Sequence, residues 1–509
     1  MFERVGQKLG LSAIPQIFLT AAGIAILFVC LAIPFNEAVA AFFGAVGGFT
    51  FRYFGWFYVV SVSGLLIFLV WIAFSRYGEI RLGADDETPQ YSTETWFAML
   101  FAAGIGTILM FWGVAEPLSH FANPPLEGIE AQSIDAAKHA MNIAMYHFGL
   151  HTWTIFTMPA LAIAYFTYRK NLPMRISSVF YPVLGERIFG PLGWAIDIIA
   201  LLGTLFGVAV SVGLGTLQLN SGLNAVFGVP VGQLSQILLV VVITAVAGVS
   251  VALGLDRGIK RLSEFNIVLA LAVMLFVWLT GPTLFITSGI VQNFGNYVQN
   301  LAWMSFWTEA YQGTSWQQSW TVFYWAWTIS WAPYVGIFIA RISRGRTIKN
   351  FVLGALCAPL AFTLVWFSVF GLAAIDLELN QGVDLVTQVQ DDVSIALFDF
   401  LANFPAPMLI SGLSLVVIVV FLTTSADSAA LVVDQLSRND IQPSLTRQRI
   451  FWTVLLGLIA GTLLLGGGLP ALQNVITTLG FPFCMLLVFM AYSLHKSLHK
   501  DYLARISQD

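Results

Sequence analysis

Charged residues are scarce in this chain. Lysine, arginine, aspartate and glutamate together make up 10% of its 509 residues, whereas soluble domains carry about 25%. Hydrophobic residues make up 58%, and the mean hydropathy is +0.81. Apolar runs long enough to cross about 30 Å of hydrocarbon recur throughout the chain. This composition argues against a soluble multidomain protein and predicts an all-α polytopic membrane protein.

Cysteine is also rare, and the motifs of several enzyme classes are absent. Cys30, Cys357 and Cys484 lie singly within apolar runs, so neither a disulfide framework nor a metal cluster is expected. The chain has no HExxH, GxSxG or phosphate-binding P-loop motif and no filter-like repeat of a channel. The first apolar run lacks a small-residue cleavage site, which indicates a retained helix. The sequence therefore predicts neither an enzyme nor a channel.

Twelve membrane spans are expected from the apolar runs. They lie at roughly 13–34, 53–75, 93–113, 139–168, 190–220, 233–254, 262–286, 316–341, 350–374, 406–432, 450–469 and 472–494. All but two of the 23 lysines and arginines then fall on one side of the membrane, and Arg52 and Lys138 fall on the other. By the positive-inside rule both termini are cytoplasmic.

Two connections between the spans are predicted to be helical. Residues 287–315 are too polar to span but carry Phe294, Trp303 and Trp307, a pattern that suits an interfacial amphipathic helix on the outer surface. Residues 384–402 mix acidic and apolar side chains at helical spacing and are also expected outside.

The middle of the third span is rich in small residues, at Ala102-Ala103-Gly104-Ile105-Gly106-Thr107. Such residues can simply allow close helix packing. They can also let the helix unwind at the bilayer midplane, where freed backbone groups bind a carboxylate or a cation, as in many secondary transporters. Both interpretations stay open, and the span is expected to end at Glu116-Pro117.

The fourth span contains two histidines one helical turn apart, His147 and His151. This spacing can ligate a metal ion, but no third ligand is evident nearby. Histidines bonded to neighbouring helices are the better interpretation. Phe148 and Phe156 share one face of this helix, and Trp153 lies to one side.

The eighth and tenth spans carry the other candidate side chains. Trp320, Tyr324, Trp327 and Trp331 form one stripe on a helix, which either packs in the core or stacks on a cation. In the tenth span, the run Thr423-Thr424-Ser425-Ala426-Asp427-Ser428 is costly in lipid and marks a functional site. Its hydroxyl oxygens suit a small alkali cation such as Na⁺.

Four segments together resemble the betaine/choline/carnitine transporter (BCCT) family: LFAAGIGTILMFWGVAEP, HFGLHTW, FYWAWTISWAPYVGIFIARISRGRTI and TTSADS. The resemblance implies one transmembrane domain over 1–509 with the leucine-transporter-type fold. In it, two helices within 13–75 precede inverted repeats at 93–286 and 316–494. The outer helix 287–315 lies between the repeats, and 495–509 is a short cytoplasmic tail.

The resemblance also implies a set of substrate-binding residues. The positions that match the family's aromatic box and its unwound third span are Phe148, Trp153, Phe156, Trp327, Thr328, Trp331, Gly104, Ile105 and Gly106. The betaine-carrier pattern has tryptophan where Phe148 and Thr328 stand, and tyrosine where Phe156 stands. Trp331 and Thr328 are expected to face the substrate, whereas Trp320, Tyr324 and Trp327 pack in the core or line a passage.

Coupling by Na⁺ is implied by a second set of matches. Backbone carbonyls of Ala102, Ile105 and Phe421, with the hydroxyls of Thr424 and Ser425, match the family's Na⁺-coupled members. A second and weaker Na⁺ site would involve Ser211 and Tyr334. No other cofactor is implied.

The expected function is import of a small quaternary-ammonium or zwitterionic solute by Na⁺ symport with alternating access. A H⁺-coupled symporter, an exchanger, or a carrier of a sulfonium or ectoine-type solute remains an alternative. The resemblance implies a homotrimer in the lipid of the bacterial inner (plasma) membrane, with multiple spans and no nucleic-acid partner.

Overall fold

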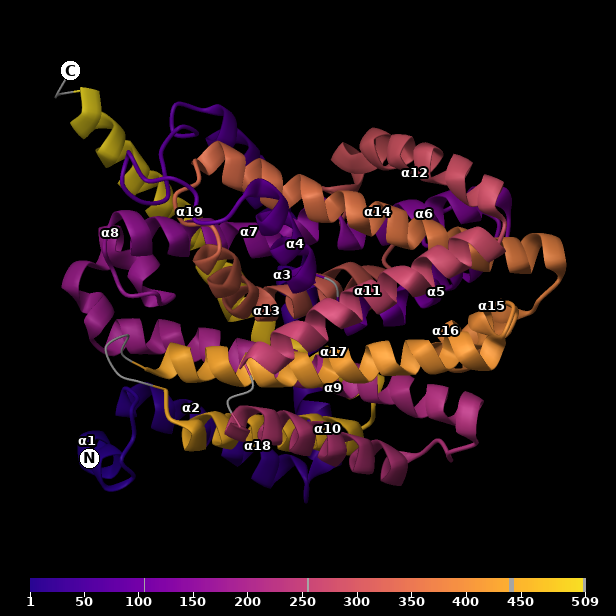
Figure 1. Cartoon of the computed structure of the whole chain (residues 1–509), viewed down its shortest axis with the longest axis horizontal. Helices are drawn as coiled ribbons and strands as arrows, with labels where there is room; N and C mark the ends of the chain where they lie inside the picture. Colours follow the sequence, from indigo (N-terminus) through magenta and orange to yellow (C-terminus); the bar gives the residue numbers. More distant parts are fainter. Residues whose placement is uncertain (105, 254–255, 439–443, 507–509) are drawn as a thin grey trace.

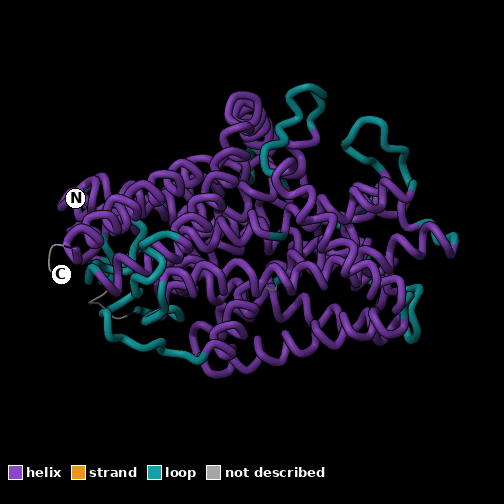
Figure 2. The backbone as a smooth tube through the Cα atoms, turned by 90° about the horizontal axis from the view of Figure 1, so that it is seen from above, coloured by secondary structure: helices purple, strands orange, loops and turns teal. Residues whose placement is uncertain are grey.

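Helices make up nearly all of the structure, a computed structural model that describes residues 1–104, 106–253, 256–438 and 444–506. Figure 2 shows the loops as connections between helices, and no β-strand occurs among these residues. The all-α membrane fold expected from the composition is therefore confirmed.

The first half of the chain forms twelve helices of the α type. They are α1 Phe2–Lys8, α2 Pro15–Ala32, α3 Asn36–Phe74, α4 Thr93–Gly104, α5 Thr107–Ala122, α6 Ile134–Phe148, α7 Leu150–Ala164, α8 Tyr181–Leu184, α9 Pro191–Phe227, α10 Gln233–Leu253, α11 Asp256–Thr280 and α12 Thr283–Met304. Shorter turns Tyr165–Arg169, Ser177–Phe180 and Gly185–Phe189 surround α8.

The second half forms the remaining helices. They are α13 Phe323–Arg341, α14 Ile348–Gln381, α15 Leu385–Asp391, α16 Ala396–Leu401, α17 Pro407–Ser437, α18 Thr446–Leu465 and α19 Leu469–Ile506. A π-helical turn Gln318–Val322 leads into α13, and a short turn Val393–Ile395 separates α15 from α16.

Ten of the described helices are long and apolar enough to cross a membrane. The two other expected spans, 93–113 and 139–168, are each built from two shorter helices. The first is α4 and α5, with the small-residue motif between them, and α5 continues through Pro117 to Ala122. The expected end at Glu116-Pro117 is therefore wrong. The proline ring is accommodated because it packs where Gly371 on α14 lacks a side chain.

The break between α6 and α7 lies at Gly149 and was not expected from the sequence. A Cβ atom at this position would lie 2.6 Å from the Tyr297 hydroxyl of α12 and 2.4 Å from the Met145 carbonyl oxygen. Only glycine lets these groups approach so closely. The Tyr297 hydroxyl then accepts the freed backbone N–H of Leu150 at 3.0 Å.

Long helices from distant parts of the chain pack in pairs. In Figure 1, α12 and α14 lie along the upper edge, and α2, α10 and α18 lie along the lower edge. Between these edges, α9 packs against α17 and α13 packs against α7. Along the lower edge α10 packs against α18. Helix α5 packs against α14. The break in α4/α5 is bordered by α9, α13 and α14, and the break in α6/α7 is bordered by α13 and α14.

Both connecting segments are helical as predicted, and the C-terminal segment is helical as well. Residues 287–315 contain most of α12, and 384–402 contain α15 and α16. Within the predicted tail 495–509, α19 continues to Ile506, the end of the described residues. Its Asp501 carboxylate pairs with Arg169 at 3.3 Å and also with Lys170, which holds the end of α19 against the segment after α7.

Candidate functional site

A cavity of about 60 Å³ lies where the two broken helices meet α9, α13 and α14. Its lining residues are Gly106, Ile108 and Leu109 of α5 and its start, Phe148, Thr152, Trp153 and Phe156 of α6 and α7, Ser211 of α9, Tyr324, Trp327, Thr328 and Trp331 of α13, and Thr363 of α14. Seven of the nine substrate-binding residues predicted from the sequence therefore share one cavity.

The two remaining predictions concern Gly104 and Ile105. Ile105 lies outside the described residues, and so do the surroundings of Gly104 and Ala102. Gly106 has an extended backbone and precedes the first turn of α5. The backbone N–H groups at the start of a helix carry a partial positive charge, so this end of the cavity favours an anionic group.

Aromatic rings form much of the cavity wall. The rings of Trp153 and Phe156 meet edge to face, with centroids 5.7 Å apart. Phe148 stacks on Phe367 of α14 at 4.7 Å, and its ring also meets Tyr324 edge to face at 5.0 Å. These contacts fix the rings in place, so the wall is preorganised rather than collapsible.

Two tryptophans of α13 differ in what their indole N–H groups contact. Trp327 donates to Ser211 Oγ at 3.0 Å and to the Gly207 carbonyl at 3.3 Å. The Trp331 Nε1 atom is buried and has no hydrogen-bond partner among the described residues. A buried donor without a partner is costly, so Trp331 offers an N–H group that a bound molecule can satisfy.

Thr328 is half-buried, and its hydroxyl donates to the Tyr324 carbonyl at 2.7 Å. Since a hydroxyl has one proton and two lone pairs, the Thr328 oxygen remains available as an acceptor in the cavity. A tryptophan at this position would add a ring and remove that acceptor.

Tyr324 lines the cavity but is not among the substrate-binding residues predicted from the sequence, which assigned it to packing or to a passage. The stripe on α13 does reach the cavity through Tyr324, Trp327 and Trp331, whereas Trp320 contacts Trp112 and His120 instead. Periodicity identified the stripe, but only the neighbouring helices decide which of its rings border open space.

The predicted Na⁺ ligands are only partly described. Thr424 is half-buried on α17, and its hydroxyl bonds back to the carbonyl oxygens of Val420 at 2.8 Å and Phe421 at 3.3 Å. Ser425 is half-buried beside it. The weaker second Na⁺ site was predicted to use Ser211 and Tyr334. Ser211 lies beside Trp327. Tyr334 lies two helical turns beyond Trp327 on α13, and its ring packs against Trp331 with centroids 5.6 Å apart.

The two histidines of the fourth span have separate partners, which agrees with the interpretation that each bonds to neighbouring helices. His151 lies 3.1 Å from Ser305 Oγ and stacks on Trp325. His147 Nδ1 lies 2.6 Å from Glu116 Oε1, and its Nε2 lies 2.9 Å from Thr321 Oγ1. Sequence reasoning missed the role of Glu116, although an acidic residue within a span is itself a signal of function.

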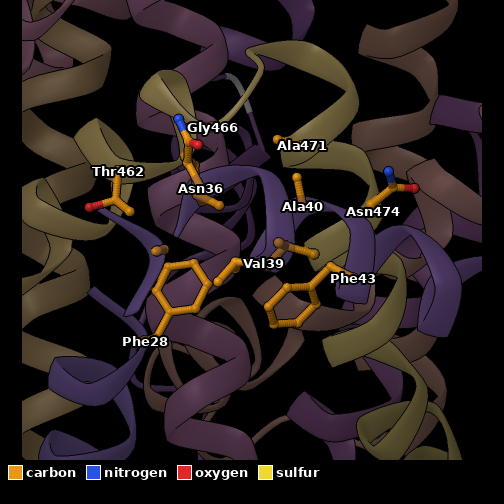
Figure 3. Close-up of a pocket in the computed structure, with 12 residues that line it drawn as sticks. Phe28, Asn36, Val39, Ala40, Phe43, Thr462, Gly466, Ala471 and Asn474 are labelled. Carbon is orange, nitrogen blue, oxygen red and sulfur yellow. The ribbon is translucent and has the colours of Figure 1, made fainter. Parts of the chain in front are cut away.

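A second cavity, of about 20 Å³, lies between α2, α3, α18 and α19 (Figure 3). Phe28, Val39 and Phe43 line it, with the amides of Asn36 and Asn474 at its edge. It is smaller than the aromatic cavity, and none of its lining residues is among those predicted to bind the solute. The aromatic cavity is therefore the candidate site.

Known proteins resemble this chain over nearly its whole length. Residues 16–503 match the model of a family described as betaine/carnitine/choline family transporter. An ectoine/glycine betaine/proline transporter of Corynebacterium glutamicum is 45% identical over 500 residues, which cover 97% of this chain and 81% of that protein. A glycine betaine transporter of Acinetobacter baylyi is 43% identical, over 96% of this chain and 74% of that protein.

Two further likenesses are more distant. The high-affinity choline transport protein of Escherichia coli is 39% identical, over 96% of this chain and 72% of that protein. A solved structure of a Na⁺-coupled sialic acid symporter, substrate-bound and outward-open, covers 86% of each chain with 16% identity and a TM-score of 0.44. That structural likeness is too weak to support an argument about this chain.

Proposed function

This chain belongs to the betaine/carnitine/choline transporter family, and we propose that it imports a small quaternary-ammonium or related zwitterionic solute by Na⁺ symport. One observation carries the proposal: the aromatic cavity lies at the meeting point of two broken helices. Broken helices with a binding site between them are the usual design of secondary transporters.

The aromatic wall supports binding of the solute's cationic end. Trp153, Phe156 and Trp331 present rings to one cavity, and a cation over such a ring gains about 0.5–2 kcal/mol per contact. The start of α5 at Gly106 supports binding of an anionic end. A zwitterion would satisfy both ends of the cavity at once.

Thr328 supports a second candidate, a carrier of solutes whose cationic group bears an N–H. Its free acceptor can bind such an N–H, whereas a trimethylammonium group has no donor to offer. The relative from Corynebacterium glutamicum is named for ectoine, glycine betaine and proline. Ectoine and proline carry the N–H that Thr328 would bind.

The proposed Na⁺ site uses carbonyls of Ala102, Ile105 and Phe421 with the hydroxyls of Thr424 and Ser425. Support comes from the half-buried hydroxyls on α17, which are hard oxygen ligands. Ser211 and Tyr334 would serve a second site. A H⁺-coupled carrier or exchanger on the same fold would not need these hydroxyls.

Two inverted repeats, 93–286 and 316–494, would move around the cavity. The helix packing supports this arrangement: α9 packs against α17 and α10 against α18, and α5 packs against α14 as α13 packs against α7. When the two repeats are exchanged, the pairs α9–α17 and α10–α18 each map onto themselves. The pair α5–α14 maps onto the pair α13–α7. Alternating access then amounts to one set of helices rocking against the other.

We further propose a homotrimer in the bacterial inner membrane, with both termini cytoplasmic. The charge distribution supports the orientation. One face of α12 exposes Leu284, Val291, Phe294 and Val298, which supports α12 as the contact between protomers. Native mass spectrometry in detergent tests the trimer, and a monomeric mass for both the wild type and Val298→Glu would contradict it.

Uptake of radiolabelled glycine betaine into proteoliposomes tests the transport function. Accumulation should require an inward Na⁺ gradient and should cease when the gradient is dissipated. Equal uptake with and without the gradient would contradict Na⁺ coupling. Ectoine and proline, added unlabelled, identify the preferred solute by competition.

A further inference from the structure

Three titratable side chains form a fully buried cluster beside the cavity. Glu116 and His120 lie one turn apart on α5, and His147 lies on α6. Glu116 Oε1 is 2.6 Å from His147 Nδ1 and 3.4 Å from His120 Nε2. The rings of Trp316 and Trp320 lie against the two imidazoles, at 5.8 Å from His147 and 4.4 Å from His120, so bulk water is excluded.

The charge on this cluster can be balanced only by protons. Among the described residues, the ion-pair partners of Glu116 are the two histidines and include neither lysine nor arginine. A buried carboxylate without a compensating charge costs several kcal/mol. In addition, Oε1 and Nδ1 at 2.6 Å would repel each other unless a proton lay between them. The Nδ1–H of a neutral His147 supplies that proton. The negative charge of Glu116 then remains, and one further proton, on the carboxyl or on an imidazole, neutralises it.

A metal ion fits the same three side chains less well. Zinc binds histidine nitrogen and carboxylate oxygen at about 2.0–2.1 Å in tetrahedral geometry, which separates two ligand atoms by about 3.3 Å. The 2.6 Å between Glu116 and His147 is too short for two ligands of one ion and fits a shared proton. His147 Nε2, on the far side of the ring, faces Thr321.

Tyr324 connects the cluster with the cavity. Its ring lines the cavity and lies 5.0 Å from the ring of His147. Its hydroxyl faces Glu116 without reaching hydrogen-bond geometry, and both Tyr324 Oη and Glu116 Oε2 are buried without a hydrogen-bond partner among the described residues. A small shift of the phenol would satisfy the donor and the acceptor together.

The surroundings of Glu116 contain few other titratable groups. His120 on α5, His147 on α6 and Tyr324 on α13 face it. His151 on α7 interacts with His147 in turn. Among the described residues, no titratable side chain of α9, α14, α15, α16 or α17, which also pack against α5, is a partner of the cluster.

We propose that Glu116, His120 and His147 form a proton-binding site that Tyr324 couples to the solute cavity. When the site releases its proton to water, ionised Glu116 accepts the Tyr324 hydroxyl proton in a hydrogen bond. The hydrogen-bonded phenol is more electron-rich, so its ring attracts a cation more strongly. Release of the proton also removes one positive charge from beside the cavity. Affinity for a cationic group therefore rises with pH, and by linkage the solute expels the proton.

The proton site is tested first by infrared spectroscopy of the purified full-length protein in detergent. A pH titration over about pH 4 to about 8, the range in which carboxyl and imidazole groups titrate, should change a band that Glu116→Gln removes. The band is a carboxylic C=O stretch if Glu116 holds the proton, or an imidazolium mode if His147 does. Asp197→Asn is the matched control and should leave that band in place. Asp197 is a buried carboxyl on α9, and it accepts hydrogen bonds from the backbone N–H of Ser177 at 2.9 Å and from the Ser177 hydroxyl at 2.8 Å. A titration that Glu116→Gln leaves unchanged overturns the proposal.

The coupling is tested by binding of choline and glycine betaine, measured by tryptophan fluorescence over the same pH range. Neither solute titrates there, so any pH dependence of Kd belongs to the protein. In the wild type the affinity should rise with pH, by up to about tenfold per pH unit for one linked proton. Addition of solute to weakly buffered protein should release up to about one proton per chain.

Two variants separate the parts of the coupling. Glu116→Gln should bind solute with a pH-independent Kd and release no proton. Tyr324→Phe keeps the cluster and its infrared titration but should lose most of the pH dependence of Kd. A flat Kd in the wild type, or an unchanged slope in both variants, overturns the coupling. If neither solute binds at any pH, the proposed solute class fails, and the infrared titration alone still decides the proton site.

Discussion

The hydroxyl of Tyr297 on α12 accepts the backbone N–H of Leu150 at 3.0 Å, one residue beyond the break at Gly149. In a membrane, a freed backbone N–H has no water to bond and costs several kcal/mol if left alone. Tyr297 therefore stabilises the broken helix that carries Phe148, Trp153 and Phe156 into the cavity. A side chain of α12 thus helps to position the wall of the aromatic cavity.

Tyr297→Phe should lower the stability of the protein by about 1–3 kcal/mol, because the Leu150 N–H loses its buried acceptor. Thermal unfolding in detergent measures the effect. The control is Tyr311→Phe, since Tyr311 is fully exposed and its removal should not change the midpoint. An equal midpoint for wild type and Tyr297→Phe would show that the break is satisfied in another way.

Thr328→Val should weaken binding of ectoine and proline by roughly 3–10-fold and leave glycine betaine nearly unchanged. The substitution keeps the shape and removes the acceptor, and one hydrogen bond contributes about 0.5–1.5 kcal/mol. Thr328→Trp should instead strengthen glycine betaine binding by roughly tenfold through an added ring. Competition binding with each solute measures both. Parallel losses for all solutes in Thr328→Val would argue that Thr328 acts only in packing.

Thr424→Ala and Ser425→Ala should each raise the Na⁺ concentration needed for half-maximal uptake by about tenfold or more. The reason is that each removes one Na⁺ ligand, and a loss of about 1.4 kcal/mol in binding free energy corresponds to a tenfold change. Ser414→Ala is the matched control, because Ser414 lies on the same helix and its hydroxyl also bonds back one turn, to Ile410 at 2.9 Å. Uptake into proteoliposomes at graded Na⁺ gives the measurement. A carrier coupled to H⁺ would respond alike to all three substitutions.

Glu309 should make the stability of the loop before α13 depend on pH. Burial raises the pKa of its carboxyl, although the backbone N–H groups of Gln317 and Trp316 act in the opposite direction. Because the folded pKa is raised, the stabilising contribution is present below the unfolded pKa and is lost as pH rises through the folded pKa. The temperature of the unfolding midpoint in the wild type should therefore decrease as the pH is raised from about 4 to neutral.

The matched variant for this effect is Glu309→Gln, which keeps the shape of the side chain and cannot ionise. Its midpoint should exceed that of the wild type at neutral pH and vary less with pH. A pH profile identical in the two proteins would assign the dependence to another group.

Several features of this protein follow from the sequence alone because they are properties of single segments. Hydropathy identified the helices that can cross a membrane, and the small residues around Ile105 offered unwinding as one of two interpretations for the stretch where α4 ends at Gly104 and α5 begins at Thr107. Spacing placed Trp327 and Trp331 on one stripe of α13. Each of these depends on neighbours within a few helical turns, where periodicity and composition are informative.

The tertiary structure alone decided which polar groups meet. Glu116 and His147 are 31 residues apart, Ser211 and Trp327 are 116 apart, and Leu150 and Tyr297 are 147 apart. No local pattern links such residues, since their contact depends on the rotation and depth of whole helices against one another. The break at Gly149 is of this kind as well: the glycine is visible in the sequence, but the hydroxyl that requires it comes from α12.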